Sequence, residues 1–446
     1  MFKSNYNISN NFETTFLNII IILTIFILFL KFFILYPIYP SSDEILSIER
    51  FTKPWTFLRK NEIANHTINS FIAVLIKYLF GPDILYYRFI SFLCFCLIIF
   101  FFKKLYPNIL AYCFFILLIL SSSVLTAYIY IFRGYYTWAF LVVLNFYFLK
   151  KYIQNNFDNK NYNIILFLNL IMACHALFTL YTVIPNLSVI FCAAIIRKDL
   201  KKIYNFFIFF FLPLVIYYFA VCVLEGFVNS FSGNLTLNYL VNNFFNVVKI
   251  GFPIGFKAIF LSEHMHGFSV QENFFILAIK SLLHINDPEY SILLIFIISF
   301  GILLIKILKK QTNLIDLIIL FMLIFFYVAG FVPEIRVYVG ISFFLLFYIF
   351  ENVFIFFVVL NKWIKFKYFF VTILIFFFYL KLPPPDDKLS IHTKYEIINI
   401  RSLKNFYSCK ELNDILNQHE IWIFKNIFTK DCSSRYDFIN NKNILF

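Results

Sequence analysis

Asp43 and Glu44 form a pair of adjacent carboxylates that directly follows a long apolar run, Phe16–Leu35, and its flanking prolines. A carboxylate at a membrane surface can take a proton from a hydroxyl nucleophile, or hold a divalent cation against a phosphate. The pair could also be solvated loop residues that help to fix topology, because acids cost about 2.5–3.5 kcal/mol at the centre of a membrane helix and less near its ends. Taken alone, the pair leaves both interpretations open.

Further ionisable residues occur where later apolar segments begin or end. Singly, an arginine could snorkel from a helix end to lipid phosphates, and a histidine could be an ordinary loop residue. Together these residues place acids, one histidine and three arginines on one predicted side of the membrane, and the planar guanidinium group suits phosphate oxygens. The set therefore predicts displacement of a phosphate leaving group at the outer membrane surface. The residues are His66 in "ANHTINS", Arg88 in "LYYRFIS", Arg133 in "IFRGYY", and Glu334 with Arg336 in "VPEIRVY".

The composition predicts a membrane-embedded chain that could position these residues. Hydrophobic residues make up 61% of the 446 and charged residues 14%, whereas a soluble domain carries about a quarter charged residues. The net charge of +14 does not indicate nucleic-acid binding, because the basic residues form small clusters between apolar runs. We therefore expect an all-α polytopic protein of the cell inner (plasma) membrane. Its predicted partner is the lipid bilayer, and it is not expected to bind nucleic acid.

About eleven apolar segments have a length suited to crossing a bilayer, which takes about 20 residues. They are approximately 16–38, 84–102, 108–130, 135–149, 162–178, 180–196, 204–224, 290–308, 314–331, 337–358 and 367–382. Basic clusters then fall in alternate loops, at Lys103-Lys104, Lys150-Lys151, Arg197 to Lys202, Lys306 to Lys310 and Lys362 to Lys367. By the positive-inside rule these loops and the N-terminus are cytoplasmic. The first span is interpreted as a retained signal anchor.

The opposite, exoplasmic side is predicted to carry two long loops and the C-terminal tail. The loops are 39–83 and 225–289. We divide the chain into a transmembrane catalytic domain, 1–382, and a small exoplasmic α/β domain, 383–446. Cys409 and Cys432 of the tail could form a disulfide in an oxidising compartment, or could stay unpaired.

Residues 68–81, inside the first exoplasmic loop, are apolar but are too short for a span and are interrupted by Lys77. An amphipathic helix lying in the membrane interface fits this pattern better. Counting the segment as a span would also reverse the sidedness of every later loop and spoil the charge rule.

The order of motifs in residues 15–200 resembles the GT-C superfamily of membrane glycosyltransferases, which use polyprenyl-phosphate-linked sugars. The matching features are the Asp43-Glu44 pair, the following Asn65-His66, "LFG" at 79–81 and Arg88 opening the second span. Similar bacterial members are protein O-mannosyltransferases, the aminoarabinose transferase acting on lipid A, and lipopolysaccharide-core transferases. The "PEIRVY" turn also fits the resemblance.

This resemblance implies transfer of a sugar, with inversion, from a lipid-phosphate donor to a glycan, lipid or protein acceptor of the cell envelope. The reaction would take place at the exoplasmic (periplasmic) face. Asp43 becomes the catalytic base or metal-organising acid, with Glu44 as its partner and Glu334 as a supporting acid. A divalent cation, Mg²⁺ or Mn²⁺, is left open, because some members use one and others manage with basic residues. The residues expected to bind the donor phosphate are His66, Arg88, Arg133 and Arg336.

The long loop 225–289 is expected to shape the acceptor site through "SEHMHG" at 262–267. Glu263, His264 and His266 are the candidate residues there. As a metal motif, two histidines at spacing two with one glutamate form only a weak signal.

Two other functions are compatible with a polytopic chain of this kind. A transporter or lipid-linked-sugar flippase would place ionisable residues near the middle of its spans and often shows a repeat. Here the span interiors are almost free of charge, with Lys31 as the clearest exception, and no repeat is visible. A ligase or polymerase of O-antigen type would concentrate its arginines in one large exoplasmic loop, whereas 225–289 contains none. The transferase is therefore the favoured hypothesis.

Overall fold

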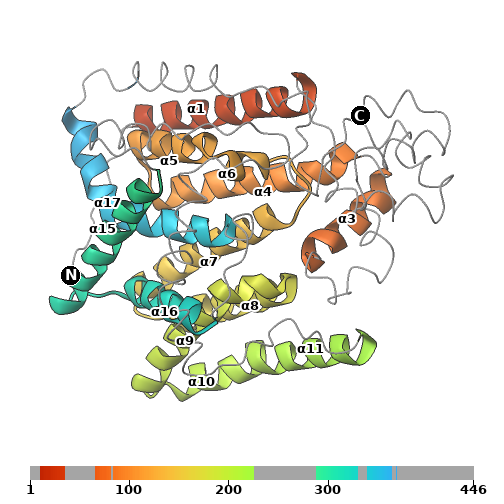
Figure 1. The fold of residues 1–446 in the computed structure, drawn as a ribbon, viewed down its shortest axis with the longest axis vertical. Helices are drawn as coiled ribbons and strands as arrows, with labels where there is room; N and C mark the ends of the chain where they lie inside the picture. Colours follow the sequence, from red (N-terminus) through yellow and green to blue (C-terminus); the bar gives the residue numbers. More distant parts are fainter. Residues whose placement is uncertain are drawn as a thin grey trace.

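The structure is a computed structural model that describes residues 11–35, 66–81, 84–225, 288–329, 339–363 and 368. Within these residues every regular element is helical and no strand occurs (Figure 1). The helices are α1 (Asn11–Phe29), α3 (Thr67–Phe80), α4 (Ile84–Leu105), α5 (Ile109–Ser121), α6 (Ser123–Ala127), α7 (Tyr135–Gln154), α8 (Asn159–His175), α9 (Leu180–Ile196), α10 (Leu200–Phe206), α11 (Leu212–Glu225), α15 (Pro288–Leu308), α16 (Leu314–Ala329) and α17 (Val339–Trp363). Short π-helical stretches extend α1 and join α10 to α11, and a 3-10 turn, Leu177–Thr179, precedes α9.

Each predicted apolar segment up to 337–358 falls on a described helix, while 367–382 lies outside the described residues apart from Tyr368. Among the described residues, three helical stretches are long and apolar enough to cross a membrane: Leu85–Leu105, Leu200–Ala220 and Val339–Asn361. The total of eleven spans remains a prediction, as does the C-terminal domain, because 383–446 also lies outside the described residues.

The predicted segment 108–130 is not a single helix. It is divided at Ser122, whose backbone is extended and whose side chain accepts a hydrogen bond of 3.1 Å from the Leu125 amide. A serine in this position satisfies an amide at the start of a new helix, and so it begins the short α6. The chain then enters a turn, residues 128–134, before α7 begins.

Helix α7 is the central element of the described bundle and packs against α4, α8 and α17. Most of its side chains are buried. The beginning of α17 approaches it closely, because a Cβ atom at Gly340 would lie only 2.3 Å from Cδ2 of Trp138. Aromatic rings fill much of the interior, as in the stacked pair of Phe102 and Phe115, whose centroids are 3.9 Å apart.

The helix ends that carry the basic clusters gather at one end of the bundle, which we call the lysine-rich end. Here the guanidinium of Arg197 lies 3.4 Å from the centroid of the Phe157 ring. Asp199 caps α10 by accepting from the Lys202 amide at 3.2 Å, and it pairs with the Lys202 ammonium. These hydrogen bonds to Lys202 hold the pKa of Asp199 below its ordinary value. In Figure 1, α9 ends and α10 begins at the lower left, on this side of the bundle.

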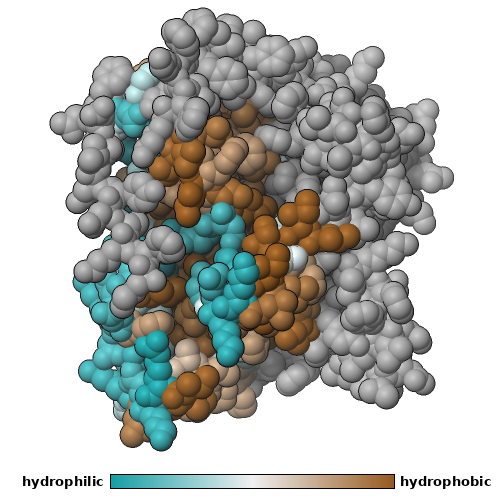
Figure 2. All heavy atoms as spheres, turned by 90° about the vertical axis from the view of Figure 1, so that its left-hand side faces the viewer, coloured by the Kyte–Doolittle hydropathy of each residue, from teal (hydrophilic) through white to brown (hydrophobic). Residues whose placement is uncertain are grey.

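The outward faces of the helices are strongly apolar. Helix α3 is the clearest case, because it buries the small or polar residues Thr67, Asn69, Ser70 and Ala73. It exposes large apolar side chains instead, including Leu79 and Tyr78, the latter 91% accessible. A helix in water has the reverse arrangement, so this polarity is the one expected beside lipid. Figure 2, which looks onto the left-hand side of Figure 1, shows broad hydrophobic areas beside groups of hydrophilic side chains.

Three buried asparagines join α7, α8 and α9 inside the bundle. Asn186 donates to the side-chain oxygen of Asn169 at 3.1 Å, and Asn169 donates to that of Asn145 at 3.4 Å. Amide side chains commonly link helices in an apolar environment, where water offers no competing partner. This series of amides therefore fixes the relative rotation of the three helices.

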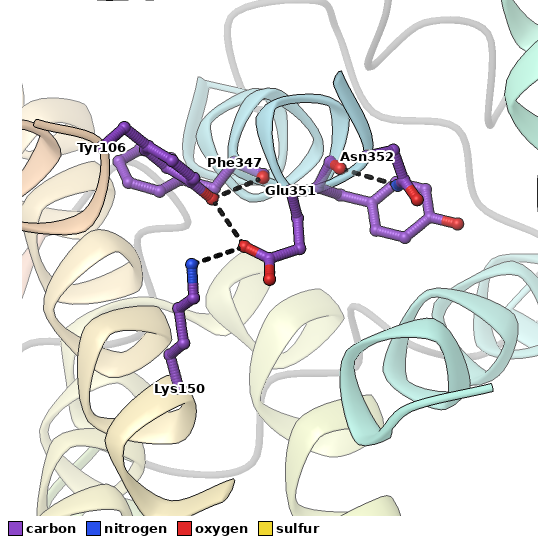
Figure 3. Close-up of polar contacts among 6 residues, drawn as sticks. Tyr106, Lys150, Phe347, Glu351 and Asn352 are labelled. Carbon is purple, nitrogen blue, oxygen red and sulfur yellow. Dashed lines mark hydrogen bonds and ion pairs between the residues drawn. The ribbon is translucent and has the colours of Figure 1, made fainter. Parts of the chain in front are cut away.

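Glu351 of α17 is a partly buried carboxylate that accepts from two directions (Figure 3). The Tyr106 hydroxyl donates to it at 3.0 Å, and the Lys150 ammonium of α7 lies 2.8 Å away. Burial and the nearby carboxylate raise the pKa of Tyr106 well above its ordinary value, so its hydroxyl keeps the proton that it donates. The contact ties α17 to α7 and to the connection between α4 and α5.

We expect Glu351→Gln to lower the free energy of unfolding by about 1.5–3 kcal/mol, since hydrogen bonds to a charged group are worth that much. A double-mutant cycle with Lys150→Met should give a coupling energy of about 0.5–3 kcal/mol. Thermal or denaturant unfolding in detergent measures both quantities. Lys309→Gln, which removes an exposed charge from the same end, serves as the control and should change stability by less than about 0.5 kcal/mol. Strictly additive single effects would contradict the ion pair.

Candidate functional site

Three of the predicted site residues lie within the described part of the chain, and each stands at the beginning of a helix. His66 directly precedes α3, Arg88 lies in the first turns of α4, and Arg133 lies in the turn before α7. The remaining candidates lie outside the described residues; they are Asp43, Glu44, Glu263, His264, His266, Glu334 and Arg336.

The segments that carry these three residues meet at the end of the bundle opposite the lysine-rich end. Helix α4 joins the turn 128–134 through Ser91, whose hydroxyl donates to the Ile131 carbonyl at 2.9 Å. The ring of Tyr87, the residue before Arg88, lies 5.4 Å from that of Phe132, the residue before Arg133. Helix α3 joins α7 through Thr137, which donates to Asn69 at 3.0 Å. The structure thus brings the positions of His66, Arg88 and Arg133 into one region.

His66 is buried in a group of aromatic rings contributed by three different segments. The centroid of its imidazole ring lies 4.8 Å from that of Tyr135, 5.2 Å from Phe178 and 5.3 Å from His175. Its environment is therefore a packed interior position and not an ordinary polar loop.

Gly134 is the backbone position against which His66 rests. A Cβ atom at Gly134 would lie 2.4 Å from Cβ of His66 and 2.7 Å from its Nδ1 atom. Only a residue without a side chain allows this approach, so the turn before α7 and the start of α3 are fitted to each other.

His175, at the end of α8, is a member of this region that the sequence reasoning missed. It is completely buried, and its Nε2 atom lies 2.9 Å from the Gly134 carbonyl oxygen. Its sequence signal was present, because it is the one histidine inside the predicted apolar segments. An ionisable residue within such a segment is by default a candidate for function.

Arg88 and Arg133 are almost inaccessible, with 2% and 4% of their surface exposed. Arginine is rarely buried to this extent, because an isolated cation loses its hydration unless an anion or several acceptors replace it. The guanidinium of Arg133 also lies 6.0 Å from the centroid of the Tyr135 ring, which packs on His66. Two guanidinium groups held in one protected region can provide fixed positive charge for an anionic group.

The described residues do not contain a group of three or more His, Cys, Asp or Glu that could hold a metal ion. Asp43, the residue expected to organise a divalent cation, lies outside them. The buried charged side chains that the structure describes at this end are arginines, whose guanidinium groups suit phosphate oxygens.

We expect Gly134→Ala to destabilise the protein by about 1–3 kcal/mol, the usual cost of forcing additional atoms into a packed site. Gly301→Ala in α15 is the matched control, because nothing lies within 4 Å of a Cβ atom added there. Replacing this helical glycine should raise stability by about 0.5–1 kcal/mol. The midpoint of thermal unfolding in detergent distinguishes the two variants. Equal behaviour would mean that Gly134 is not closely packed on His66.

Comparisons with known proteins do not place this geometry in a family. A search of protein-family models, curated proteins and solved structures found no match for the chain. Function is therefore inferred from the contacts described above and from the order of motifs in the sequence.

Proposed function

We propose that this chain is an integral-membrane glycosyltransferase of the GT-C type, which moves a sugar from a polyprenyl-phosphate carrier to an acceptor of the cell envelope. The observation that carries the proposal is the burial of Arg88 and Arg133, together with His66, at the end of an apolar helical bundle opposite its lysines. The site would face the periplasm, with the lysine-rich end in the cytoplasm and about eleven spans in the inner membrane. Residues 383–446 would form a small exoplasmic domain.

Sugar transfer from a polyprenyl-phosphate carrier requires the protein to stabilise a phosphate leaving group. The acceptor oxygen attacks the anomeric carbon while the bond from that carbon to the phosphate oxygen breaks. The carrier then leaves as a phosphate monoester with the electron pair of the broken bond. Fixed guanidinium groups in a site that excludes water stabilise the developing negative charge, and this term is usually the largest single contribution to catalysis.

Asp43 is assigned the role of the base, because it directly follows the first apolar run and would lie at the same membrane surface. It would accept the proton of the acceptor hydroxyl as the oxygen attacks, so that the hydroxyl becomes a competent nucleophile. Glu44, its neighbour in the chain, is assigned as its supporting partner.

A transporter or flippase is the alternative, and the buried series Asn145, Asn169 and Asn186 is the observation in its favour. The carboxylates described within the predicted spans, Glu351 and Asp316, do not support it, because each already pairs with a lysine, Glu351 with Lys150 and Asp316 with Lys306. A transported substrate would instead need ionisable groups near the middle of the bundle. The transferase therefore accounts for more of the described polar residues.

We expect Arg133→Gln to reduce sugar transfer by about 10²-fold or more, as the loss of one fixed positive group at developing charge does. Mass spectrometry of envelope glycans and lipid-linked sugars, with and without the protein, identifies donor and acceptor together and then measures the variant. Asp43→Asn should abolish transfer without affecting membrane insertion. Lys309→Gln removes an equal charge from the lysine-rich end and should transfer normally. Normal transfer by well-expressed Arg133→Gln would remove Arg133 from the mechanism.

The orientation is tested separately with reporter fusions. A reporter after Lys310 should be cytoplasmic, because this residue belongs to the lysine-rich end, and one after Pro385 should be exoplasmic. Enzymatic reporters that are active on only one side of the membrane give the answer directly. Exchanged readings would mean that a span has been miscounted and that the arginines face the cytoplasm.

A further inference from the structure

The turn that carries Arg133 is held by contacts from several elements. Within the turn, the Arg133 amide donates to the Ile131 carbonyl at 2.8 Å, and the Tyr135 amide donates to the Arg133 carbonyl at 2.6 Å. The Gly134 carbonyl accepts from the Trp138 amide at 2.9 Å, which is the first hydrogen bond of α7. The same carbonyl oxygen lies 2.9 Å from Nε2 of His175, which belongs to α8.

This second contact determines which imidazole nitrogen carries hydrogen. A backbone carbonyl can only accept, so the hydrogen bond requires a proton on Nε2 of His175. In the neutral ring the lone pair is then on Nδ1. His175 therefore contributes a directed N–H donor to the turn, and a side chain without such a donor would leave that lone pair of the Gly134 carbonyl without its partner from α8.

The backbone of His175 is itself anchored. Tyr217 and Tyr218 of α11 donate to the carbonyls of Cys174 and Ala173 at 3.1 and 3.0 Å. On the other side, the Thr179 hydroxyl donates to the Ala176 carbonyl at 2.6 Å. The Nε2–H group of His175 therefore lies at a fixed helix end. Its hydrogen bond holds the Gly134 carbonyl in a defined position relative to that end.

The position of Gly134 affects two of the predicted phosphate-binding residues, Arg133 and His66. Arg133 is its immediate neighbour in the chain, and His66 packs against its Cα. The imidazole rings of His66 and His175 also lie next to each other, with their centroids 5.3 Å apart. A shift of this turn would therefore move Arg133 and release His66 at the same time.

We propose that His175 is a positioning residue of the phosphate-binding site. Its Nε2–H hydrogen bond to the Gly134 carbonyl fixes the Arg133–Gly134 turn so that the guanidinium and His66 meet the donor phosphate together. The identity of the anion rests on the proposed function, whereas the geometry of the hydrogen bond does not. His175 need not touch the sugar or its carrier to act in this way.

The test compares two side chains of equal length, His175→Gln and His175→Met. Glutamine places an amide N–H near the position of Nε2, and methionine fills similar volume without a donor. We expect the methionine variant to bind polyprenyl phosphate in detergent micelles about tenfold more weakly, the effect of losing one hydrogen bond at the upper end of its usual range. The glutamine variant should stay within about threefold of the wild type. In transfer assays the methionine variant should raise KM for the donor more than it lowers kcat.

Hydrogen exchange separates the positioning role from the identity of the ligand. The amides of Tyr135 and Trp138 should exchange faster in His175→Met than in His175→Gln, because the turn has lost its contact with α8. Equal binding and equal exchange in the two variants would overturn the proposal. A wild-type protein that neither binds polyprenyl phosphate nor transfers sugar would overturn the proposed function, while the exchange rates would still decide whether His175 holds the turn.

Discussion

The absence of a side chain at Gly134 is the constraint on which the candidate site depends. Through this position the start of α3 and the end of α8 both reach the turn before α7, one by direct packing of His66 and the other by the hydrogen bond from His175. Any Cβ atom there would separate α3 from the turn. The site is therefore a property of tertiary packing, assembled where helix ends from distant parts of the chain meet.

The rest of the described bundle shows the polarity of a protein whose solvent is lipid. Polar side chains are directed inward, as in the asparagine series between α7, α8 and α9 and in the buried face of α3. Large aliphatic and aromatic side chains not only fill the interior but also cover much of the outward surface. Buried amides lose little in this setting, because they find partners on neighbouring helices, and the same low-polarity surroundings strengthen any charge interaction made by Arg88 and Arg133.

Much of the helical architecture could be predicted from the sequence, because apolar runs of the required length mark the helices and lysine pairs mark their ends. The helix at 68–81 was also predicted, since its length and its interruption by Lys77 are local features. The division at Ser122 was not predicted, because a serine in an apolar run is compatible with an unbroken helix until its side chain is seen to cap the next one.

Only part of the candidate site could be predicted from the sequence, because the rest depends on contacts between distant segments. His66, Arg88 and Arg133 could be predicted as site residues because each is ionisable and lies at a predicted helix end, which the local sequence is enough to show. His175 had a sequence signal, as a histidine inside a predicted apolar segment, but its role could not be predicted because it depends on a contact with Gly134 at another helix boundary. The requirement for glycine at position 134 likewise arises from the close approach of His66. That approach is a tertiary contact, which the sequence alone does not show.

The attachment of α17 has a consequence for how the molecule can move. Its first turn is seated against Trp138 at Gly340, and three turns further along Glu351 is bound to Lys150. These two contacts hold the helix to α7 near opposite ends of its buried length, so it can neither slide nor tilt without breaking one of them. A rocking motion of α17 against α7 is therefore disfavoured, and the two helices are expected to move as one rigid unit.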